Sequence, residues 1–481
     1  MSTRIEELSI LELQALMDAG KLSSGELVLH LMERVSKLDK AGPRINSVLE
    51  INPDAYHIAL ALDHERSLGL KRGPLHGIPV LIKDNIDTGD KMHTTAGSLA
   101  IANNIAKEDA FVVQKLRESG AVIFGKANMT EWANFMTKGM PNGYSSRGGQ
   151  VLNPYGPGIF DVGGSSSGSG AAVAAGFATV ALGTETSGSI LSPANENSVV
   201  GIKPTVGLVS RSGVIPIAFS QDTVGPLART VTDAAIVLEA IAGVDLKDPS
   251  TRLSADRIPT KYASFLREDA LKNARIGVSF EYFKRVLNES LQKLFIKAIE
   301  GMQEAGAIII DDISFPPSEV EWDYNILIYE FKVGLNNYLI NSNPNNRVRS
   351  LADVIEFNRN NREKCLKYGQ YYLLEAERTS GTLTEWEYVK SRRNGLDYAQ
   401  KKGINQTMEK YNLDAIITPG PMGAYIPAKA GYPSINVPCG YGDQNQPFGI
   451  TFTSRAFEEP KLISLAYSFE QAMAARKAPE I

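Results

Sequence analysis

Hydrophobic and polar positions along the chain alternate between helical and strand-like patterns. Near the N-terminus, residues 9–12 and 23–26 each read Ser-x-x-Glu before a helical apolar pattern. This is the pattern of a capping box, so the chain is expected to open with two helices. A third helix is predicted to begin with Asn52 as its N-cap and Pro53 at its first position, and to end near Gly69.

Short apolar runs rich in β-branched residues follow and predict buried strands. The runs are 78–82, 121–124, 275–280, 307–310, 414–418, 434–437 and 449–452. Helical patterns separate some of them, as at 109–119 and 289–304. Because helices and strands interleave over the full length, we expect an α/β fold of the three-layer α/β/α type, with a large mixed sheet covered by helices.

The chain shows neither a repeat nor a low-complexity linker, and we expect one domain over residues 1–481. Within it we distinguish an N-terminal helical section (1–69), a Gly/Ser-rich core (70–244), an insertion or second helical layer (245–410), and C-terminal strands and a helix that complete the core (411–481). The polar section between about 245 and 270 places the border after the core.

Composition narrows the class of protein. Lys plus Arg is 50 and Asp plus Glu is 54, for a formal net charge of −4. Since there is no basic block, no nucleic-acid partner is expected. The two cysteines, Cys365 and Cys439, are too few for a disulfide framework and, with no signal-peptide pattern, favour a cytoplasmic protein. The apolar run 171–182 is too short to span a bilayer, so we interpret it as a buried core helix and expect no membrane partner. The oligomeric state cannot be derived from the sequence.

The stretch 163–190 carries the candidate chemistry. Two Gly/Ser loops surround a small-residue apolar segment, and Glu185 is its only charged side chain. Serine supplies a nucleophile once a base is close, and glycine lets backbone N–H groups approach a bound atom. Ser166, Ser167 and Ser169 are expected to be structural, capping a helix that begins near Ala171.

The base of such a site is not a histidine in the usual order. All five histidines, at positions 30, 57, 64, 76 and 93, precede the serine loops, which excludes the α/β-hydrolase order of nucleophile before histidine. Lys83 ends the apolar run 78–82, where a buried amine can lose its proton. The alternative is a lysine at a strand end that reaches water.

Three segments together, 77–85, 163–170 and 183–190, resemble the signature of the amidase signature family. The resemblance implies that family's large mixed sheet and a Ser-Ser-Lys triad, in which the nucleophile follows the bridging serine by 24 residues. Here 189 − 165 = 24, which selects Ser165 as the bridge, Ser189 as the nucleophile and Lys83 as the base. It also implies a cis peptide bond at the bridging serine and an acyl-enzyme intermediate, with no cofactor and no metal.

The turn before Ser189 is the candidate oxyanion hole. The backbone N–H groups of Thr186, Ser187 and Gly188 are expected to point at the negative charge that develops on the carbonyl oxygen. The aromatic and Met side chains at 129, 132, 135 and 144 either line the pocket or pack in the core, and core packing is favoured.

The expected substrate is a small-molecule or peptide amide. Segments 132–134, 146–149 and 349–358 resemble the peptide amidase branch, which suggests C-terminal peptide amides. One alternative is the glutaminase-type subunit of an amidotransferase, but Leu191 stands where many family members carry arginine, and 185–189 reads Glu-Thr-Ser-Gly-Ser rather than Asp-x-Gly-Gly-Ser. A different class is an anion- or nucleotide-binding protein that uses the Gly/Ser loop, although the Walker and G-x-G-x-x-G patterns are absent from it.

Overall fold

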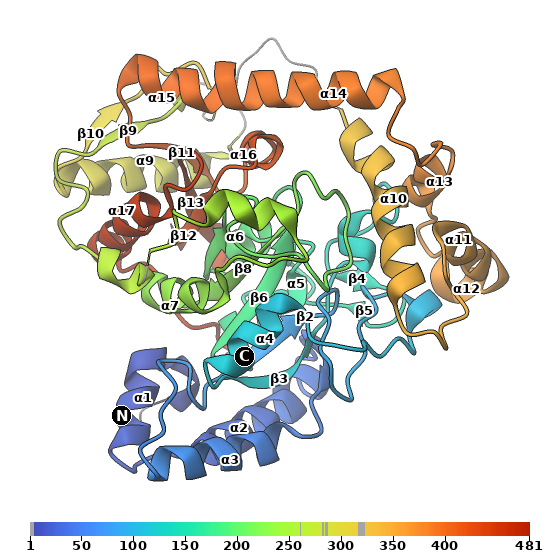
Figure 1. Cartoon of the computed structure of the whole chain (residues 1–481). Helices are drawn as coiled ribbons and strands as arrows, with labels where there is room; N and C mark the ends of the chain where they lie inside the picture. The colour runs from blue at the N-terminus through green and yellow to red at the C-terminus, as the bar shows by residue number, and fades with distance from the viewer. Residues whose placement is uncertain (1–3, 260, 281–282, 284–286, 316–322) are drawn as a thin grey trace.

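A mixed β-sheet of 11 strands, in the order β1-β3-β2-β6-β8-β7-β12-β13-β11-β9-β10, runs through the described part of the chain (Figure 1). The computed structural model describes residues 4–259, 261–280, 283, 287–315 and 323–481. The strands are β1 (Val48–Ile51), β2 (Pro79–Lys83), β3 (Val122–Ala127), β6 (Val180–Glu185), β7 (Val200–Lys203), β8 (Thr223–Ala228), β9 (Arg275–Gly277), β10 (Ile308–Ile310), β11 (Ala415–Pro419), β12 (Ser434–Tyr441) and β13 (Pro447–Thr453), with a separate small hairpin of β4 (Tyr144–Ser145) and β5 (Gly149–Gln150).

Helices cover both faces of this sheet, which confirms the expected three-layer α/β/α class. In one group, α4, α7, α9 and α17 pack on strands and on neighbouring helices of the same group, and in the other α5 and α6 pack together and on the central strands. The helices are α1 (Ile10–Asp18), α2 (Ser24–Arg34), α3 (Ala55–Ser67), α4 (Phe111–Glu118), α5 (Ser167–Ala174), α6 (Leu191–Glu196), α7 (Val231–Ile241), α9 (Glu289–Glu304), α10 (Asn325–Asn341), α11 (Leu351–Asn360), α12 (Arg362–Cys365), α13 (Tyr371–Glu377), α14 (Trp386–Leu396), α15 (Gln406–Tyr411), α16 (Tyr425–Ala430) and α17 (Glu459–Met473). None of the helices described is long and apolar enough to cross a membrane.

The N-terminal helices begin where the capping pattern predicts. Ser9 and Ser23 each accept a hydrogen bond from the backbone N–H three residues later, and both reciprocal glutamate contacts are present. The predicted start of α3 was wrong by two residues. Its N-cap is Asp54, and the side chain of Asn52 instead accepts a hydrogen bond from the Asp54 N–H at 3.0 Å, which forms a turn before the helix.

The apolar run 171–182 is not one helix, as the sequence had suggested. Helix α5 begins at Ser167 and ends at Ala174, and strand β6 begins at Val180. Between them Gly176 adopts φ +68°, and the Phe177 N–H donates to the Ala172 carbonyl at 2.8 Å. A glycine in the left-handed region ends a helix in this way, so the run supplies a buried helix and then a buried central strand.

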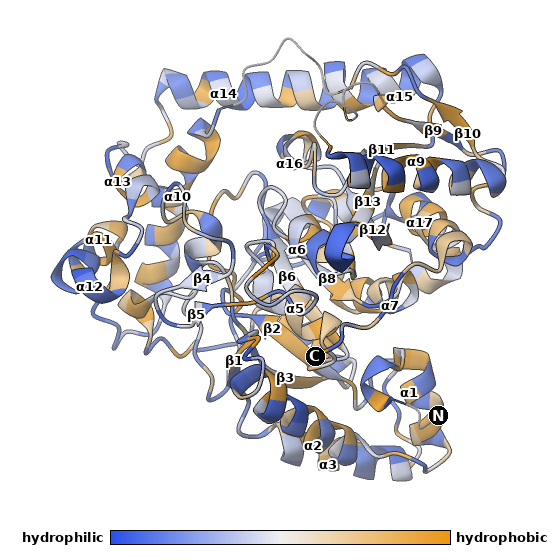
Figure 2. Cartoon of the chain, turned by 180° about the vertical axis from the view of Figure 1, so that it is seen from behind, coloured by the Kyte–Doolittle hydropathy of each residue, from blue (hydrophilic) through white to orange (hydrophobic). Residues whose placement is uncertain are grey.

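Apolar side chains form a main core along the sheet and a second cluster beside it. The second cluster joins the segment around Trp132 and Phe135 to Phe331 of α10 and to residues of α11 and α13. Figure 2 shows the central strand β2 as strongly hydrophobic, whereas the peripheral helix α12 is mostly hydrophilic. This second cluster fixes the segment 129–140 next to the sheet.

The sheet topology brings three chain segments to one edge. Strands β2 and β6 are parallel neighbours, so Lys83 and Glu185 end at the same edge. Strand β8 is antiparallel to β6 and pairs Thr223 with Glu185, so Asp222 enters at that edge as well. In an α/β sheet the carboxyl edge of parallel strands is the usual place for a site.

Candidate active site

Lys83 lies at the centre of a buried cluster of hydroxyl groups. Its Nζ is 2.8 Å from Ser165 Oγ and 2.9 Å from Ser166 Oγ. Thr184 of β6 provides two further partners, its Oγ1 at 2.9 Å and its carbonyl oxygen at 3.2 Å. The side chain does not reach water, because the residue is 0% exposed. The alternative of a lysine that extends into solvent is therefore wrong.

The surroundings of Lys83 favour a neutral amine. Burial lowers its pKa well below the ordinary value of 10.5, while the carboxylates of Glu185 and Asp222 act in the opposite direction. A neutral amine keeps a lone pair that can take a proton from a serine hydroxyl. The cluster thus supplies a general base without a histidine.

The bridging position is held by the segment that leads into α5. The peptide bond between Gly164 and Ser165 is cis. A Cβ at Gly164 would lie 2.5 Å from Asn142 Oδ1 and 2.8 Å from Thr130 Oγ1, so the close packing here requires glycine. Ser165 is fully buried, and its carbonyl oxygen accepts a hydrogen bond from the Thr130 N–H at 3.1 Å.

Ser166 does not cap α5, contrary to the expectation from the sequence. Its hydroxyl contacts Lys83 Nζ and lies 3.1 Å from the Thr184 carbonyl oxygen. Nor do its neighbours cap the helix, since Ser167 Oγ donates to the Gly163 carbonyl at 2.6 Å and Ser169 Oγ to the Leu182 carbonyl at 2.9 Å. These serines tie the helix to the strand and to the loop before it.

Ser189 lies in a tight loop organised by one buried carboxylate. Glu185 Oε1 accepts a hydrogen bond from the Gly188 N–H at 2.7 Å, and Oε2 accepts one from Ile190 at 2.7 Å and one from Leu191 at 3.0 Å. Burial raises the pKa of this carboxyl, and these backbone bonds and Lys203 act against that rise. Gly188 has φ +81°, which only glycine adopts at little cost. The loop therefore folds back over Glu185 and presents Ser189 outward.

The two serine segments meet at the backbone, where the Ser166 N–H donates to the Ser189 carbonyl at 3.2 Å. Among the described residues, no hydrogen bond joins the hydroxyls of Ser165 and Ser189. Such contacts are often long in a free enzyme and shorten when the substrate is bound.

A cavity of about 440 Å³, measured as the space open to the centre of a water-sized sphere, reaches Ser189. Apolar and aromatic side chains form much of its wall, with a few polar groups near Ser189 and at 323 and 429. The lining residues are Ala133, Asn134, Phe135, Gly164, Thr186, Ser187, Ser189, Ile217, Gln221, Asp323, Tyr324, Leu327, Tyr425 and Lys429. Phe135 stacks on Tyr372 at 5.0 Å between ring centroids, so this pocket wall is continuous with the second apolar cluster.

The candidate oxyanion donors differ in their contacts. The Gly188 N–H already donates to Glu185, whereas the N–H groups of Ser187 and Ser189 form no hydrogen bond with another described residue. The Thr186 side chain is fixed by a hydrogen bond of 2.5 Å from its hydroxyl to Asp222 Oδ1. Gln221 Nε2 holds the carbonyl of the same residue at 3.2 Å.

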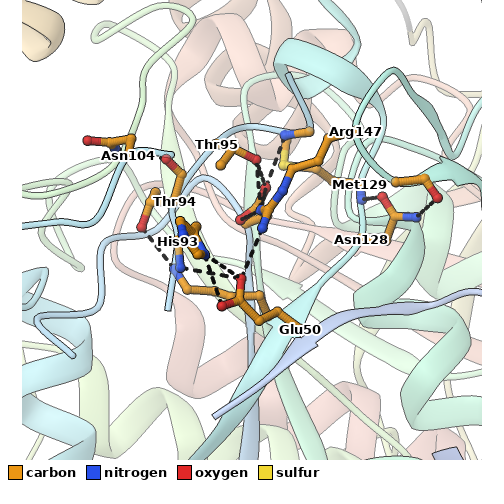
Figure 3. A network of polar contacts seen from close by, with 12 residues as sticks. Glu50, His93, Thr94, Thr95, Asn104, Asn128, Met129 and Arg147 are labelled. Atoms are coloured by element: carbon orange, nitrogen blue, oxygen red, sulfur yellow. Dashed lines mark hydrogen bonds and ion pairs between the residues drawn. The ribbon is translucent and has the colours of Figure 1, made fainter. Parts of the chain in front are cut away.

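A network of buried charges supports the end of β2 from the side opposite the serines (Figure 3). Asp84, next to Lys83, accepts hydrogen bonds from the Thr95 hydroxyl and from Arg147 Nη1, the latter at 3.4 Å. Arg147 Nη2 also contacts Glu50 at 3.0 Å, and Glu50 in turn lies 3.0 Å from His93 Nδ1. The carbonyl of Asp84 accepts the N–H groups of residues 95 and 96, each at 2.9 Å. The network holds the chain that leaves the catalytic lysine.

The structure thus brings Lys83 and Ser165 into direct contact and places Ser189 beside them at a cavity. Sequence reasoning missed Ser166, Thr184 and Asn85. Asn85 Nδ2 donates to Thr184 Oγ1 at 3.0 Å. Their signal was proximity in the chain, because each lies within two residues of a triad member or of Glu185.

The fold and the site define a hydrolase that acts on carbon–nitrogen bonds. The family model described as Amidase matches residues 26–463. The chain belongs to the amidase family, and its fold is that of the solved structures of this family.

Individual relatives extend over the same length. The chain is similar to a peptide amidase of Stenotrophomonas maltophilia, with 42% identity, a TM-score of 0.91 and 98% of each chain covered. It is 43% identical to a probable amidase of Arabidopsis thaliana, over 99% of this chain and 92% of that protein. Its identity to one of the subunits of the glutamyl-tRNA(Gln) amidotransferase of Thermoanaerobacter pseudethanolicus is lower, 35% over 97% of this chain and 96% of that protein.

Proposed function

We propose that this enzyme hydrolyses carboxylic amides, C-terminal peptide amides among them, with Ser189 as nucleophile, Ser165 as proton relay and Lys83 as base. The observation that carries the proposal is the 2.8 Å contact between a fully buried Lys83 and Ser165, next to a serine that lines a cavity. The geometry gives each group one task.

In the first half of the reaction, Ser189 Oγ attacks the amide carbonyl carbon. Its proton passes to Ser165 Oγ, whose own proton passes to the lone pair of Lys83 Nζ. The same route then delivers a proton to the nitrogen, the carbon–nitrogen bond breaks, and ammonia or an amine leaves. General acid–base catalysis of this kind contributes about 10²- to 10⁴-fold.

In the second half, water attacks the acyl-enzyme and gives a proton to Lys83 through Ser165. Collapse of the tetrahedral intermediate returns this proton to Ser189 Oγ and releases the acid. The backbone N–H groups of Thr186, Ser187 and Ser189 are the proposed donors to the oxyanion. Gly188 N–H, expected to be a donor, instead holds the loop on Glu185.

The proposed substrate class follows from the cavity and from the relatives. Phe135, Ile217 and Leu327 offer an apolar surface to the side chain next to the amide. A likeness to a peptide amidase at 42% identity supports the same class. The anion-binding alternative is unsupported, because the serines of the Gly/Ser loop are buried and bonded to protein groups. The glutaminase-type alternative is disfavoured by Leu191 and by the lower identity to the amidotransferase chain.

The test measures ammonia release from a panel of peptide, aliphatic and aryl amides. Ser189→Ala and Lys83→Met should each lose about 10³-fold or more in kcat/KM while circular dichroism stays that of the parent. Ser167→Ala is a matched control in the same loop, since among the described residues the Ser167 hydroxyl contacts Gly163 and Thr130 and no triad member. Full activity in a folded Ser189→Ala variant would refute the mechanism. A parent enzyme that prefers aliphatic or aryl amides would refute the substrate class alone.

The two cysteines support a proposed location in a reducing compartment such as the cytoplasm. Cys365 and Cys439 are both buried free thiols, and burial raises the pKa of Cys365 to about 11. Buried, protonated thiols of this kind have a packing role and do not form a catalytic site.

A further inference from the structure

A second cleft, of about 910 Å³, lies on the other side of the catalytic cluster from the substrate cavity. Asp87, Pro216, Phe219 and Tyr338 contribute to its wall, and Ser189 does not line it. Asp222 lines this cleft with its carboxylate region, and it also lines a small internal cavity behind it.

The internal cavity has a volume of about 10 Å³ by the same measure. This is about the space that one water molecule requires. Thr184, Asn85 and Thr223 line it together with Asp222. It therefore connects the hydroxyl that contacts Lys83 with a carboxyl at the second cleft.

Polar atoms around this cavity need a partner. Among the described residues, Asn85 Oδ1 and Thr223 Oγ1 are buried and have no hydrogen-bond partner. Thr184 Oγ1 accepts from Lys83 Nζ and from Asn85 Nδ2, so its own O–H must donate elsewhere. A buried polar atom without a partner costs about 1–3 kcal/mol, and a water with two to four partners removes that cost.

We propose that one water molecule occupies this cavity and that Lys83 exchanges protons with the second cleft through Thr184, this water and Asp222. The proposal rests on the proposed amide hydrolysis. In the transfer, the Lys83 ammonium gives a proton to Thr184 Oγ1, the Thr184 hydroxyl proton passes to the water, and a proton of the water passes to the Asp222 carboxylate. The products are a neutral amine and a carboxylic acid, which then releases its proton to the solvent of the cleft.

The reaction requires such an exit. At neutral pH the acid product ionises, so each turnover leaves one proton beside the triad while ammonia has departed unprotonated. The substrate cavity is filled by the product at that moment. A route on the other side of Lys83 restores the neutral base without waiting for the product to leave.

The carboxyl at the end of this route has suitable surroundings. Burial raises the pKa of Asp222 to about 6, and hydrogen bonds from Thr186 and from the N–H groups of 217 and 218, together with Arg211, act in the opposite direction. Lys83 in turn faces Glu185 and Asp222. A group that titrates near neutral pH can both accept and release a proton during turnover.

The first test compares Asp222→Asn with Asp87→Asn, measuring kcat as a function of imidazole concentration. Asp87 lines the same cleft, and burial raises its pKa to about 6 as well, but it does not line the internal cavity. We expect Asp222→Asn to lose about tenfold in kcat and to regain activity with added imidazole, which replaces the missing proton acceptor. The parent and Asp87→Asn should be independent of imidazole. A loss in Asp222→Asn that imidazole does not relieve would mean that Asp222 only positions Thr186, and this would overturn the route.

A second variant, Thr223→Val, keeps Asp222 and its contacts and replaces the hydroxyl that faces the cavity by a methyl group of similar size. It should fold and show the same imidazole-dependent kcat, and parent-like kinetics would overturn the proposal. A high-resolution crystal structure of the parent should show a water within hydrogen-bond distance of Asn85, Thr184 and Thr223. An empty cavity there would also overturn it.

A reaction that needs no amide separates this proposal from the proposed function. A fluorophosphonate forms an oxygen–phosphorus bond with Ser189 and releases fluoride, and Lys83 takes the serine proton. Because the Asp222 carboxylate favours protonated Lys83, the acid limb of the labelling rate should move to lower pH in Asp222→Asn and stay in place in Asp87→Asn. An unchanged acid limb would contradict the coupling even if no amide in the panel were hydrolysed.

Discussion

Replacing Glu185 by glutamine tests whether one carboxylate shapes the nucleophile loop. The two carboxylate oxygens accept three backbone N–H groups, one on Oε1 from Gly188 and two on Oε2 from Ile190 and Leu191. The glutamine amide can accept only through its oxygen. With that oxygen at the Oε2 position, the amide NH₂ faces the Gly188 N–H, and two donors oppose each other.

The expected loss can be worked from these contacts. One charge-assisted hydrogen bond is lost and one buried N–H is left without a partner, which lowers the free energy of unfolding by about 3 kcal/mol. Gly188 precedes the nucleophile, so Ser189 moves as well. A displacement of about 1 Å costs about 10²-fold in kcat. Since Glu185 raises the pKa of Lys83, its neutralisation also moves the acid limb of kcat/KM to lower pH.

The assay combines urea denaturation with ammonia release over a range of pH. Glu196→Gln is the matched control, because Glu196 is a glutamate of the following helix whose pKa burial raises to about 7 and whose carboxylate accepts a hydrogen bond from Asn195. The control should keep the parent kcat and acid limb. A Glu185→Gln variant with parental stability and kcat would refute the assignment of the loop to this carboxylate.

Three further predictions concern the base, the packing and the pocket. Lys83→Arg should lose about 10²-fold or more in kcat at every pH, because a guanidinium stays protonated, and activity of the parent should fall as pH drops through the lowered pKa of Lys83; a flat acid limb would contradict this. Gly168→Ala should fail to fold by circular dichroism, since its Cβ would lie 2.3 Å from the Asn128 carbonyl oxygen, whereas Gly395→Ala in α14, with its nearest neighbour at 3.5 Å, should gain up to about 1 kcal/mol in thermal unfolding. Phe135→Ala should lose about 3–5 kcal/mol of stability and raise KM for amides of aromatic residues more than for glycine amide; equal changes in KM would remove Phe135 from the specificity pocket.

The sequence predicted those elements whose cause is local. Strand β2 is buried on both faces, so its residues form a continuous apolar run that is visible without any partner. The capping boxes of α1 and α2 need only four consecutive residues. Likewise the helix 289–304 has a strong periodic pattern, and α9 has the same bounds.

The rest of the site depends on contacts between distant segments. Thr184 meets Lys83 because β6 lies beside β2, and Asp222 meets Thr186 because β8 pairs with β6. No pattern within one segment encodes such pairing. For the same reason Ser166 looked like a helix cap, because its real partner, Lys83, lies 83 residues earlier in the chain.

The two acids near Lys83 explain how its base strength can be kept within a working range. Burial by itself would lower the pKa of Lys83 too far, since an amine that never binds a proton cannot return one to the leaving group. Glu185 and Asp222 oppose that effect by favouring the protonated form. Each acid also holds a piece of the backbone, Glu185 the loop of Ser189 and Asp222 the residues 217 and 218. The same two carboxyls therefore set both the proton affinity of the base and the position of the groups around the nucleophile, so a substitution at either one must change the pH profile and the geometry together.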